Sequence, residues 1–197
     1  MSDHEILRPR LAVLLSGGGR TLQNLLDRIA DGRLRATVAG VASDRDDAFG
    51  LQRAREHDID ARHLTTPSNV WAWIGELDCD LVVLAGYLKL LPIAPEFEGR
   101  VLNIHPSLLP DFGGKGMFGD HVHRAVLDAG RAESGCTVHL CDNIYDNGRV
   151  LIQARVPVLA TDDAASLGAR VFQAECEAFP AAIQLRWREL QRTPADR

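Results

Sequence analysis

Five apolar residues, one serine and three glycines follow one another in the segment LAVLLSGGGRT, which occupies residues 11–21. An uninterrupted apolar run of this length is typical of a buried strand, so we predict a strand over Leu11–Leu15. The pattern that follows predicts a helix over Thr21–Asp31, ended by Gly32. A strand, a glycine turn and a helix in this order indicate the first unit of an α/β sheet.

The rest of the chain extends this unit into a complete sheet. We expect further parallel strands at Ala36–Ala42, Ala61–Leu64, Leu81–Ala85 and Val101–His105, with helices at Ala48–His57 and Ser68–Leu77 between them. The second half predicts two antiparallel strands and two helices, at Thr137–Asp142, Arg149–Val158, Asp120–Ala129 and Ala164–Leu190, the last interrupted near Pro180. The predicted fold is α/β: one domain over residues 1–197, core about 11–190, with an open, mostly parallel, Rossmann-like sheet, antiparallel C-terminal strands and a long C-terminal helix.

Composition and charge exclude several classes of protein. The chain has 197 residues, of which 46% are hydrophobic and 25% charged, as in soluble globular proteins. Its formal net charge of −5 argues against nucleic acid as a partner, because phosphate backbones need a basic face. Apolar runs such as Leu81–Gly86 are too short for a bilayer, and Met1–Arg10 lacks the apolar core of a signal peptide. The four cysteines form no C-x-x-C pair, so we expect a reduced, cytoplasmic protein.

The glycine turn after the first strand has two interpretations. Glycines there let the backbone approach a ligand, and the N–H groups at the start of the helix attract a phosphate-sized anion. The other interpretation is a tight turn without a ligand. Leu22 stands where a dinucleotide fingerprint has its third glycine, and no Gly-Lys-Ser/Thr follows as in a P-loop.

An amide and an imidazole end the strand expected at Val101–His105. Asn103 and His105 point the same way, because side chains repeat every two residues along a strand. Together they suit acyl transfer, in which both stabilise a carbonyl oxygen as it becomes negative. A carboxylate at Asp146 would favour the charged imidazole if the fold brings it near. The alternatives are a histidine bonded to backbone and a plain hairpin turn over Asp142–Gly148.

Two other patterns point to no cofactor. Gly114-x-Gly116-x-x-Gly119 matches a dinucleotide pattern but follows a proline-bounded loop, so we interpret Gly113–Gly119 as a mobile loop that approaches a ligand. The histidines and cysteines have no common zinc spacing, and we place His121 and His123 on a solvated helix face. We therefore expect no metal.

Four segments together resemble the phosphoribosylglycinamide formyltransferase family of the formyltetrahydrofolate-dependent formyltransferase superfamily. They are LLSGGGRTLQ at 14–23, VLAGYLKLL at 83–91, NIHPSLLP at 103–110, and Gly135–His139 running to Asp146. The resemblance covers roughly Leu11 to Glu189. It implies transfer of a formyl group from 10-formyltetrahydrofolate to glycinamide ribonucleotide in purine synthesis, by a cytoplasmic monomer or homodimer that needs no metal, nucleic acid or membrane.

The resemblance also implies residue roles. Asn103 and His105 would hold the formyl oxygen, with His105 as general acid, and Asp146 would keep that histidine protonated and relay the proton of the attacking amine. Glu175 would contact the ribonucleotide. The implied phosphate site is Gly19, Arg20 and Thr21, and the implied folate site is Leu88, Lys89, Leu90, Leu91 and Asn103.

The chain departs from the family pattern at residues of both the ribonucleotide site and the folate site. Arg20 and Thr21 stand where many members have Ser and Asn, and Phe172 replaces a Gln that helps to hold the ribonucleotide in some members. No arginine near Ser68 matches one that meets the folate in others. The alternative function is therefore formyl transfer to another amine, such as an amino sugar nucleotide. A length of 197 residues leaves no room for the extra domain of the methionyl-tRNA enzymes. A silent binding protein is the remaining alternative.

Overall fold

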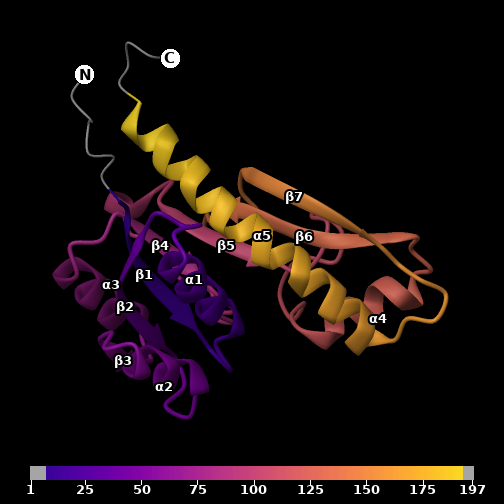
Figure 1. The fold of residues 1–197 in the computed structure, drawn as a ribbon, viewed down its shortest axis with the longest axis horizontal. Helices are drawn as coiled ribbons and strands as arrows, with labels where there is room; N and C mark the ends of the chain where they lie inside the picture. Colours follow the sequence, from indigo (N-terminus) through magenta and orange to yellow (C-terminus); the bar gives the residue numbers. More distant parts are fainter. Residues whose placement is uncertain (1–7, 193–197) are drawn as a thin grey trace.

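A seven-stranded sheet forms the centre of the computed structural model, which describes residues 8–192 (Figure 1). Neighbouring strands follow the order β3-β2-β1-β4-β5-β6-β7. The first five are parallel, whereas β6 runs antiparallel to β5 and β7 antiparallel to β6. The predicted fold class is confirmed. The strands are β1 (Arg10–Leu15), β2 (Thr37–Ser43), β3 (Ala61–His63), β4 (Leu81–Leu84), β5 (Val101–His105), β6 (Glu133–Leu140) and β7 (Val150–Pro157).

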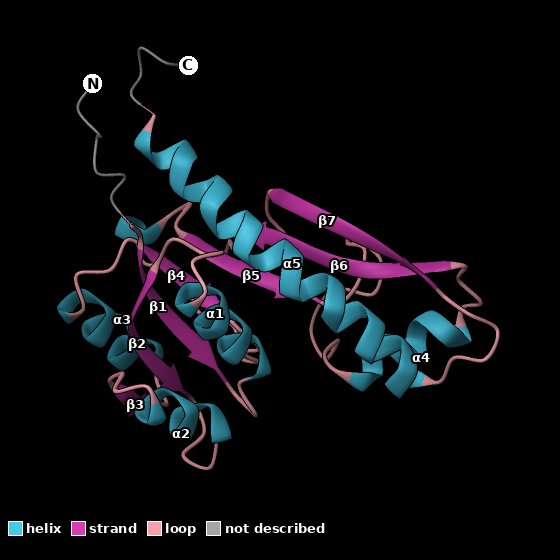
Figure 2. Ribbon diagram, viewed as in Figure 1, coloured by secondary structure: helices cyan, strands magenta, loops and turns pink. Residues whose placement is uncertain are grey.

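Helices cover both faces of the sheet (Figure 2). Leu11, Val13 and Leu15 pack on one face with residues of α1, α2 and α5, whereas Ala12 and Leu14 pack on the other with α3. Because β1 is buried on both faces, its sequence is a continuous apolar run without polar alternation. The helices are α1 (Arg20–Ala30), α2 (Phe49–Glu56), α3 (Pro67–Glu76), the short η1 (Pro95–Phe97), α4 (Asp120–Asp128) and α5 (Ala164–Gln191).

The order of the strands fixes where a ligand can bind. β1 lies between β2 and β4, so the chain leaves it in one direction through β2 and β3 and returns on its other side through β4 and β5. In open α/β sheets, ligands bind at such a reversal, outside the carboxyl ends of the strands. The loops after β1 and β4 are joined there, because the Ser16 N–H donates to the Gly86 carbonyl at 3.0 Å.

Helix α5 is continuous through Pro180, so the predicted interruption is wrong. A proline inside a helix cannot donate to the carbonyl four residues earlier, which here belongs to Cys176. The Asn24 side chain on α1 donates to that carbonyl instead, at 3.1 Å. The bond that proline removes is thus replaced by one that ties α5 to α1. Most other predicted boundaries differ by one or two residues, and the largest difference is at the start of β6, which begins at Glu133 rather than at Thr137.

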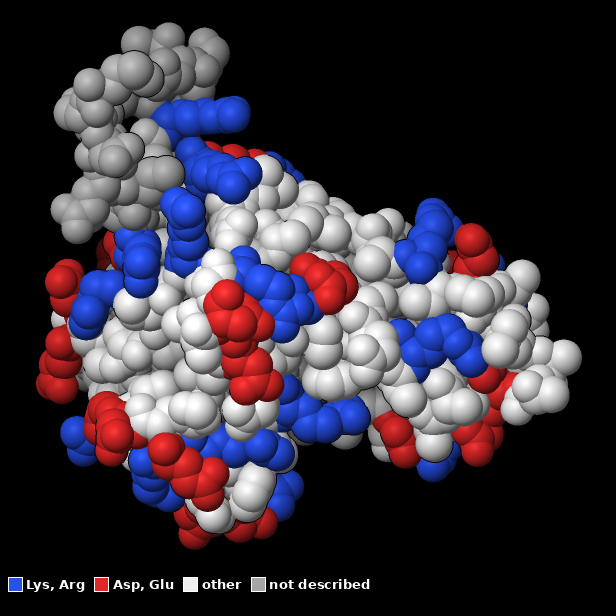
Figure 3. Space-filling model, in the orientation of Figure 1, with Lys and Arg blue, Asp and Glu red and all other residues white. Residues whose placement is uncertain are grey.

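The surface carries charged side chains of both signs. On the face drawn in Figure 3, acidic and basic side chains are interspersed, and the surface is notched between the parts that carry α1 and α2 and the part that carries α4. Within residues 8–192, no helix combines the length and the apolar character needed to cross a membrane. The described residues leave out 1–7, which belong to the N-terminal segment considered above, and 193–197.

Candidate active site

A cleft of about 390 Å³ lies at the strand reversal. Its walls come from five places, with α5 closing one side: the glycine turn after β1, the segment after β4, the end of β5, the loop at 114–119, and the end of β6 with the loop that follows it. This volume is in the range of small-molecule sites in proteins. All the residues proposed from sequence for catalysis, phosphate, ribonucleotide and folate contacts line this cleft: Gly19, Arg20, Thr21, Leu88, Lys89, Leu90, Leu91, Asn103, His105, Asp146 and Glu175.

Asn103 and His105 project into the cleft from the carboxyl end of β5. Antiparallel pairing of β5 with β6 sets His139 directly opposite Asn103. Directly opposed residues of neighbouring strands share a face of the sheet, and the Asn103 amide nitrogen lies 3.1 Å from Nε2 of His139. The same amide donates to Oδ1 of Asp146 at 3.3 Å. Asn103 and His105 of β5 and His139 of β6 therefore all lie against the carboxylate of Asp146.

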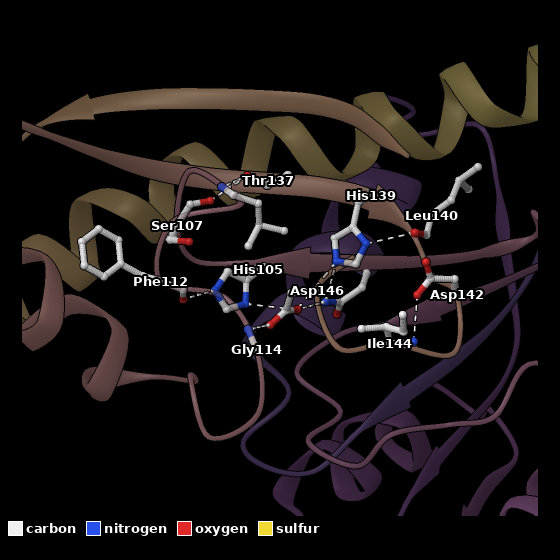
Figure 4. A network of polar contacts seen from close by, with 12 residues as sticks. His105, Ser107, Phe112, Gly114, Thr137, His139, Leu140, Asp142, Ile144 and Asp146 are labelled. Atoms are coloured by element: carbon white, nitrogen blue, oxygen red, sulfur yellow. Dashed lines mark hydrogen bonds and ion pairs between the residues drawn. The ribbon is translucent and has the colours of Figure 1, made fainter. Parts of the chain in front are cut away.

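Asp146 reaches this group because its loop folds back over β5 (Figure 4). Its Oδ1 lies 3.4 Å from Nδ1 of His105, and its Oδ2 accepts from the Gly114 N–H at 2.8 Å. Burial raises the pKa of Asp146, but the contacts with His105 and His139 and the Gly114 N–H outweigh it and hold the pKa well below its usual range. The carboxylate is therefore ionised at neutral pH.

Both ring nitrogens of His105 face oxygens that only accept hydrogen bonds. Nε2 lies 2.8 Å from the carbonyl oxygen of Phe112, and Nδ1 faces Asp146 (Figure 4). A neutral imidazole carries one N–H, so it can satisfy only one of these partners. The charged imidazolium satisfies both. His105 is also 97% buried from solvent, since only 3% of its surface is exposed. The geometry thus prepares a proton donor at the cleft.

The loop that carries Phe112 is fitted closely to this centre. A Cβ atom at Gly113 would lie 2.5 Å from Cδ2 of Leu109 and 3.2 Å from Cβ of Asp146. Only glycine allows that approach. Phe112 itself has a φ of 56°, a left-handed conformation that costs energy for a bulky residue. Gly114 and Phe118 of this loop line the cleft, and the approach of the loop to a ligand stays a prediction.

At the other end of the cleft, the glycine turn presents the start of α1. Gly19 is the N-cap residue with a φ of 71°, and a Cβ atom there would lie 2.6 Å from Cα of Gly50. The backbone of the turn therefore packs directly on α2. The first N–H groups of α1 have no partner within the helix, which makes this end attractive to an anion. Arg20 and Thr21 both line the cleft here.

The segment after β4 contributes an apolar wall. Leu88 and Leu90 are exposed by 45% and 38%, and Ile144, which also lines the cleft, is exposed by 64%. Lys89 is held by an ion pair with Asp44, with its Nζ 3.5 Å from Oδ2. Exposed apolar side chains that line one cleft suit a largely apolar ligand.

Glu175 enters the cleft from α5. Burial raises its pKa to about 7, although the positive charges of Arg20 and His105 oppose the shift. A carboxyl group with this pKa is partly protonated at neutral pH, so it can both donate and accept hydrogen bonds. This combination suits contact with the hydroxyl groups of a sugar.

Replacing Glu175 by Gln is expected to stabilise the unliganded protein at pH 8. A raised folded pKa means that the folded state binds the proton more tightly, so stability falls as pH rises from about 4.5 to 7. The Gln variant lacks this loss, which amounts to about 3 kcal/mol above pH 7. The measurement is the free energy of unfolding in urea between pH 5 and pH 8.

The matched control is Glu177→Gln on the same helix. The hydrogen bond from Arg28 lowers the pKa of Glu177, so this group stays ionised from pH 5 to pH 8. Its variant should therefore keep the wild-type slope of stability against pH. Equal slopes for the wild type and the Glu175 variant would show that Glu175 does not titrate near neutrality.

His123 is buried, so its predicted place on a solvated helix face is wrong. Only 6% of its surface is exposed, and burial lowers its pKa. Room for the ring comes from Gly168 on α5, where a Cβ atom would lie 2.8 Å from Cδ2 of the imidazole. A small residue on a neighbouring helix is a signal that no local sequence pattern carries.

Several contributors to the site were not predicted as site residues. They are the His139 ring, the Phe112 carbonyl, the Gly114 N–H and the Asp44 carboxylate, which also accepts a hydrogen bond from Ser16 at 2.5 Å. The alternation of Thr137 and His139 along β6 could have placed His139 beside Asn103. Two of the others are backbone groups, which leave no signature in side-chain identity. Among residues 8–192, no group of three or more His, Cys, Asp or Glu side chains is arranged to hold a metal ion.

Comparison with known proteins gives a consistent result. A family profile described as formyl transferase matches residues 9–183. The chain is 36% identical to the chloroplastic phosphoribosylglycinamide formyltransferase of Arabidopsis thaliana, over 95% of this chain and 70% of that protein. It is 39% identical to the phosphoribosylglycinamide formyltransferase of Escherichia coli K12, over 88% and 84%. The crystal structure of glycinamide ribonucleotide transformylase 1 from Symbiobacterium toebii has a TM-score of 0.86 and 37% identity, covering 95% of this chain and 94% of that one.

Proposed function

Because the chain belongs to the phosphoribosylglycinamide formyltransferase family, whose reaction is the formylation of glycinamide ribonucleotide in de novo purine synthesis, we propose that the cleft is its active site and 10-formyltetrahydrofolate its formyl donor. The observation that carries this proposal is the joint placement of Asn103, His105 and Asp146 at the cleft. Amide, imidazolium and carboxylate together supply what an acyl transfer to an amine requires.

The carbonyl oxygen of the formyl group becomes negative as the amine attacks its carbon. The Asn103 amide stabilises this charge by a hydrogen bond, and the Nε2 proton of His105, which faces the Phe112 carbonyl in the unliganded protein, transfers to the formyl oxygen. Asp146 holds the imidazolium opposite and relays the proton that the amine loses. That proton ends on the folate nitrogen as its bond to the formyl carbon breaks. The oxygen returns its proton to Nε2 as the carbonyl re-forms, so His105 is charged again and one C–N bond has replaced another.

The two ends of the cleft hold the two substrates. The phosphate of the ribonucleotide lies against Gly19, Arg20 and Thr21 at the start of α1, where backbone N–H groups and a guanidinium favour an anion. Glu175 meets the ribose hydroxyl groups. The folate ring lies along the apolar wall formed by Leu88, Lys89, Leu90 and Leu91. The reacting atoms then meet at Asn103 and His105, midway between the two.

A reducing compartment such as the cytoplasm suits this protein. All four cysteines, Cys79, Cys136, Cys141 and Cys176, are free thiols. Free thiols persist where glutathione and thioredoxin keep them reduced.

A panel of amine acceptors tests the proposed function. With 10-formyltetrahydrofolate as donor, we expect formylation of glycinamide ribonucleotide and at least 10³-fold lower kcat/KM with an amino sugar nucleotide, measured by the release of tetrahydrofolate. Preference for the amino sugar nucleotide would assign the chain to a different acceptor. Release of tetrahydrofolate without any acceptor would indicate a hydrolase.

A further inference from the structure

Two side chains from distant parts of the chain meet at the phosphate end of the cleft. Arg20 is the first residue of α1, and Phe172 lies on α5. The guanidinium carbon of Arg20 lies 4.4 Å from the centroid of the Phe172 ring. This distance is well within the 6 Å at which a cation is attracted to the face of an aromatic ring. Both side chains line the cleft.

Arg20 has unused hydrogen-bond donors. Within residues 8–192, no carboxylate forms an ion pair with its guanidinium, and its contact with Phe172 leaves the N–H edge open. Lys89, the other Lys or Arg side chain that lines the cleft, is paired with Asp44. Arg53, close to the same turn, donates to the Gly18 carbonyl and to Gln23. Arg20 is therefore the cation most available to an anion in this cleft.

Phe172 can act on an anion only through Arg20. A phenyl ring has no polar atom, so Phe172 offers no hydrogen bond to a phosphate. It can, however, fix the position of the guanidinium that it touches. The two side chains therefore form one unit.

We propose that Phe172 is a positioning residue for Arg20, and that it holds the guanidinium where the phosphate monoester of the ribonucleotide binds. The inference rests on the proposed function and deepens it. A free arginine side chain loses rotamer freedom when it binds an anion, which weakens binding. Stacking on a ring removes part of that loss in advance, and the flat guanidinium still offers paired N–H groups to phosphate oxygens.

The test compares substrates with and without phosphate. Phe172→Leu is expected to raise the KM for glycinamide ribonucleotide by about threefold to tenfold while kcat changes less. Arg20→Ser is expected to raise it by about tenfold to 100-fold. Phe172→Tyr keeps the ring face and should restore a KM within about twofold of the wild type. With the riboside that lacks the phosphate, neither Phe172→Leu nor Arg20→Ser should raise KM further.

A double variant tests whether Phe172 acts through Arg20. If it does, Arg20→Ser with Phe172→Leu should be no worse than Arg20→Ser alone. Phe49→Leu is the matched control, because Arg53 stacks on Phe49 at 4.9 Å outside the cleft lining. Additive losses, or an equal rise of KM for the riboside, would mean that Phe172 only packs against α1 and would overturn the proposal.

Direct binding separates this inference from the proposed function. The dissociation constants of the ribonucleotide and of inorganic phosphate, measured by calorimetry without folate, should rise in Phe172→Leu by the same threefold to tenfold. This result would stand even if the formyl acceptor proved to be another phosphorylated amine. Unchanged dissociation constants in Phe172→Leu would reject the positioning role.

Discussion

Replacing His105 by Ala is expected to lower kcat for the formylation of glycinamide ribonucleotide by about 10³-fold. The variant loses the Nε2 proton donor, which lies against the Phe112 carbonyl, and the positive charge opposite Asp146. His105 belongs to neither hydrophobic cluster of the sheet, so we expect the fold to persist. Loss of the contact between His105 and Asp146 should cost about 1–3 kcal/mol of unfolding free energy. Steady-state kinetics and urea unfolding measure the two effects.

Two further variants separate proton donation from simple loss of a side chain. His105→Gln keeps an N–H donor of similar reach but cannot transfer a proton, so its kcat should lie between those of the wild type and the Ala variant. His57→Ala removes an exposed histidine at the end of α2 and should leave kcat unchanged. Turnover by His105→Ala within about tenfold of the wild type would remove His105 from the role of general acid.

The sheet could be predicted because its strands carry local signals. The apolar run Leu11–Leu15 next to three glycines is dictated by burial on both faces and by close contact of the turn with α2. The alternation that placed Asn103 and His105 on one face is equally local. Pro180 is the exception, since its effect on α5 depends on Asn24, which is remote in sequence. Local propensity alone therefore gave a wrong interruption.

The closure of the site could not be predicted from local pattern. Asp146 meets His105 only because the loop folds back and the Gly114 N–H holds the other carboxylate oxygen. Neither event has a periodic signature, and Asp142–Gly148 has the composition of an ordinary turn. The prediction that His123 lies on a solvated helix face was wrong for the same reason, because the space that accommodates its ring is provided by Gly168 on another helix. Family resemblance supplied Asp146 where physical pattern could not.

Replacing Asp146 by Asn is expected to lower kcat by about 10²-fold and to shift the alkaline limb of the pH–rate profile to lower pH. Asn keeps the size of the side chain and one acceptor oxygen, but it removes the negative charge 3.4 Å from Nδ1 of His105. The imidazolium then lacks the charge that faces it. The wild-type pKa of Asp146 is held well below its usual range, so its charge is present throughout neutral pH. Its contribution to stability is present above about pH 4 and is lost as pH falls further.

The control for Asp146→Asn is Asp162→Asn, because hydrogen bonds also hold the pKa of Asp162 well below its usual range. The partner of Asp162 is Arg170, and the pair lies outside the cleft lining. Asp162→Asn should lower the free energy of unfolding without moving the pH–rate profile. If the profile of Asp146→Asn were instead parallel to that of the wild type, differing only in height, the carboxylate would orient the ring without stabilising its charge.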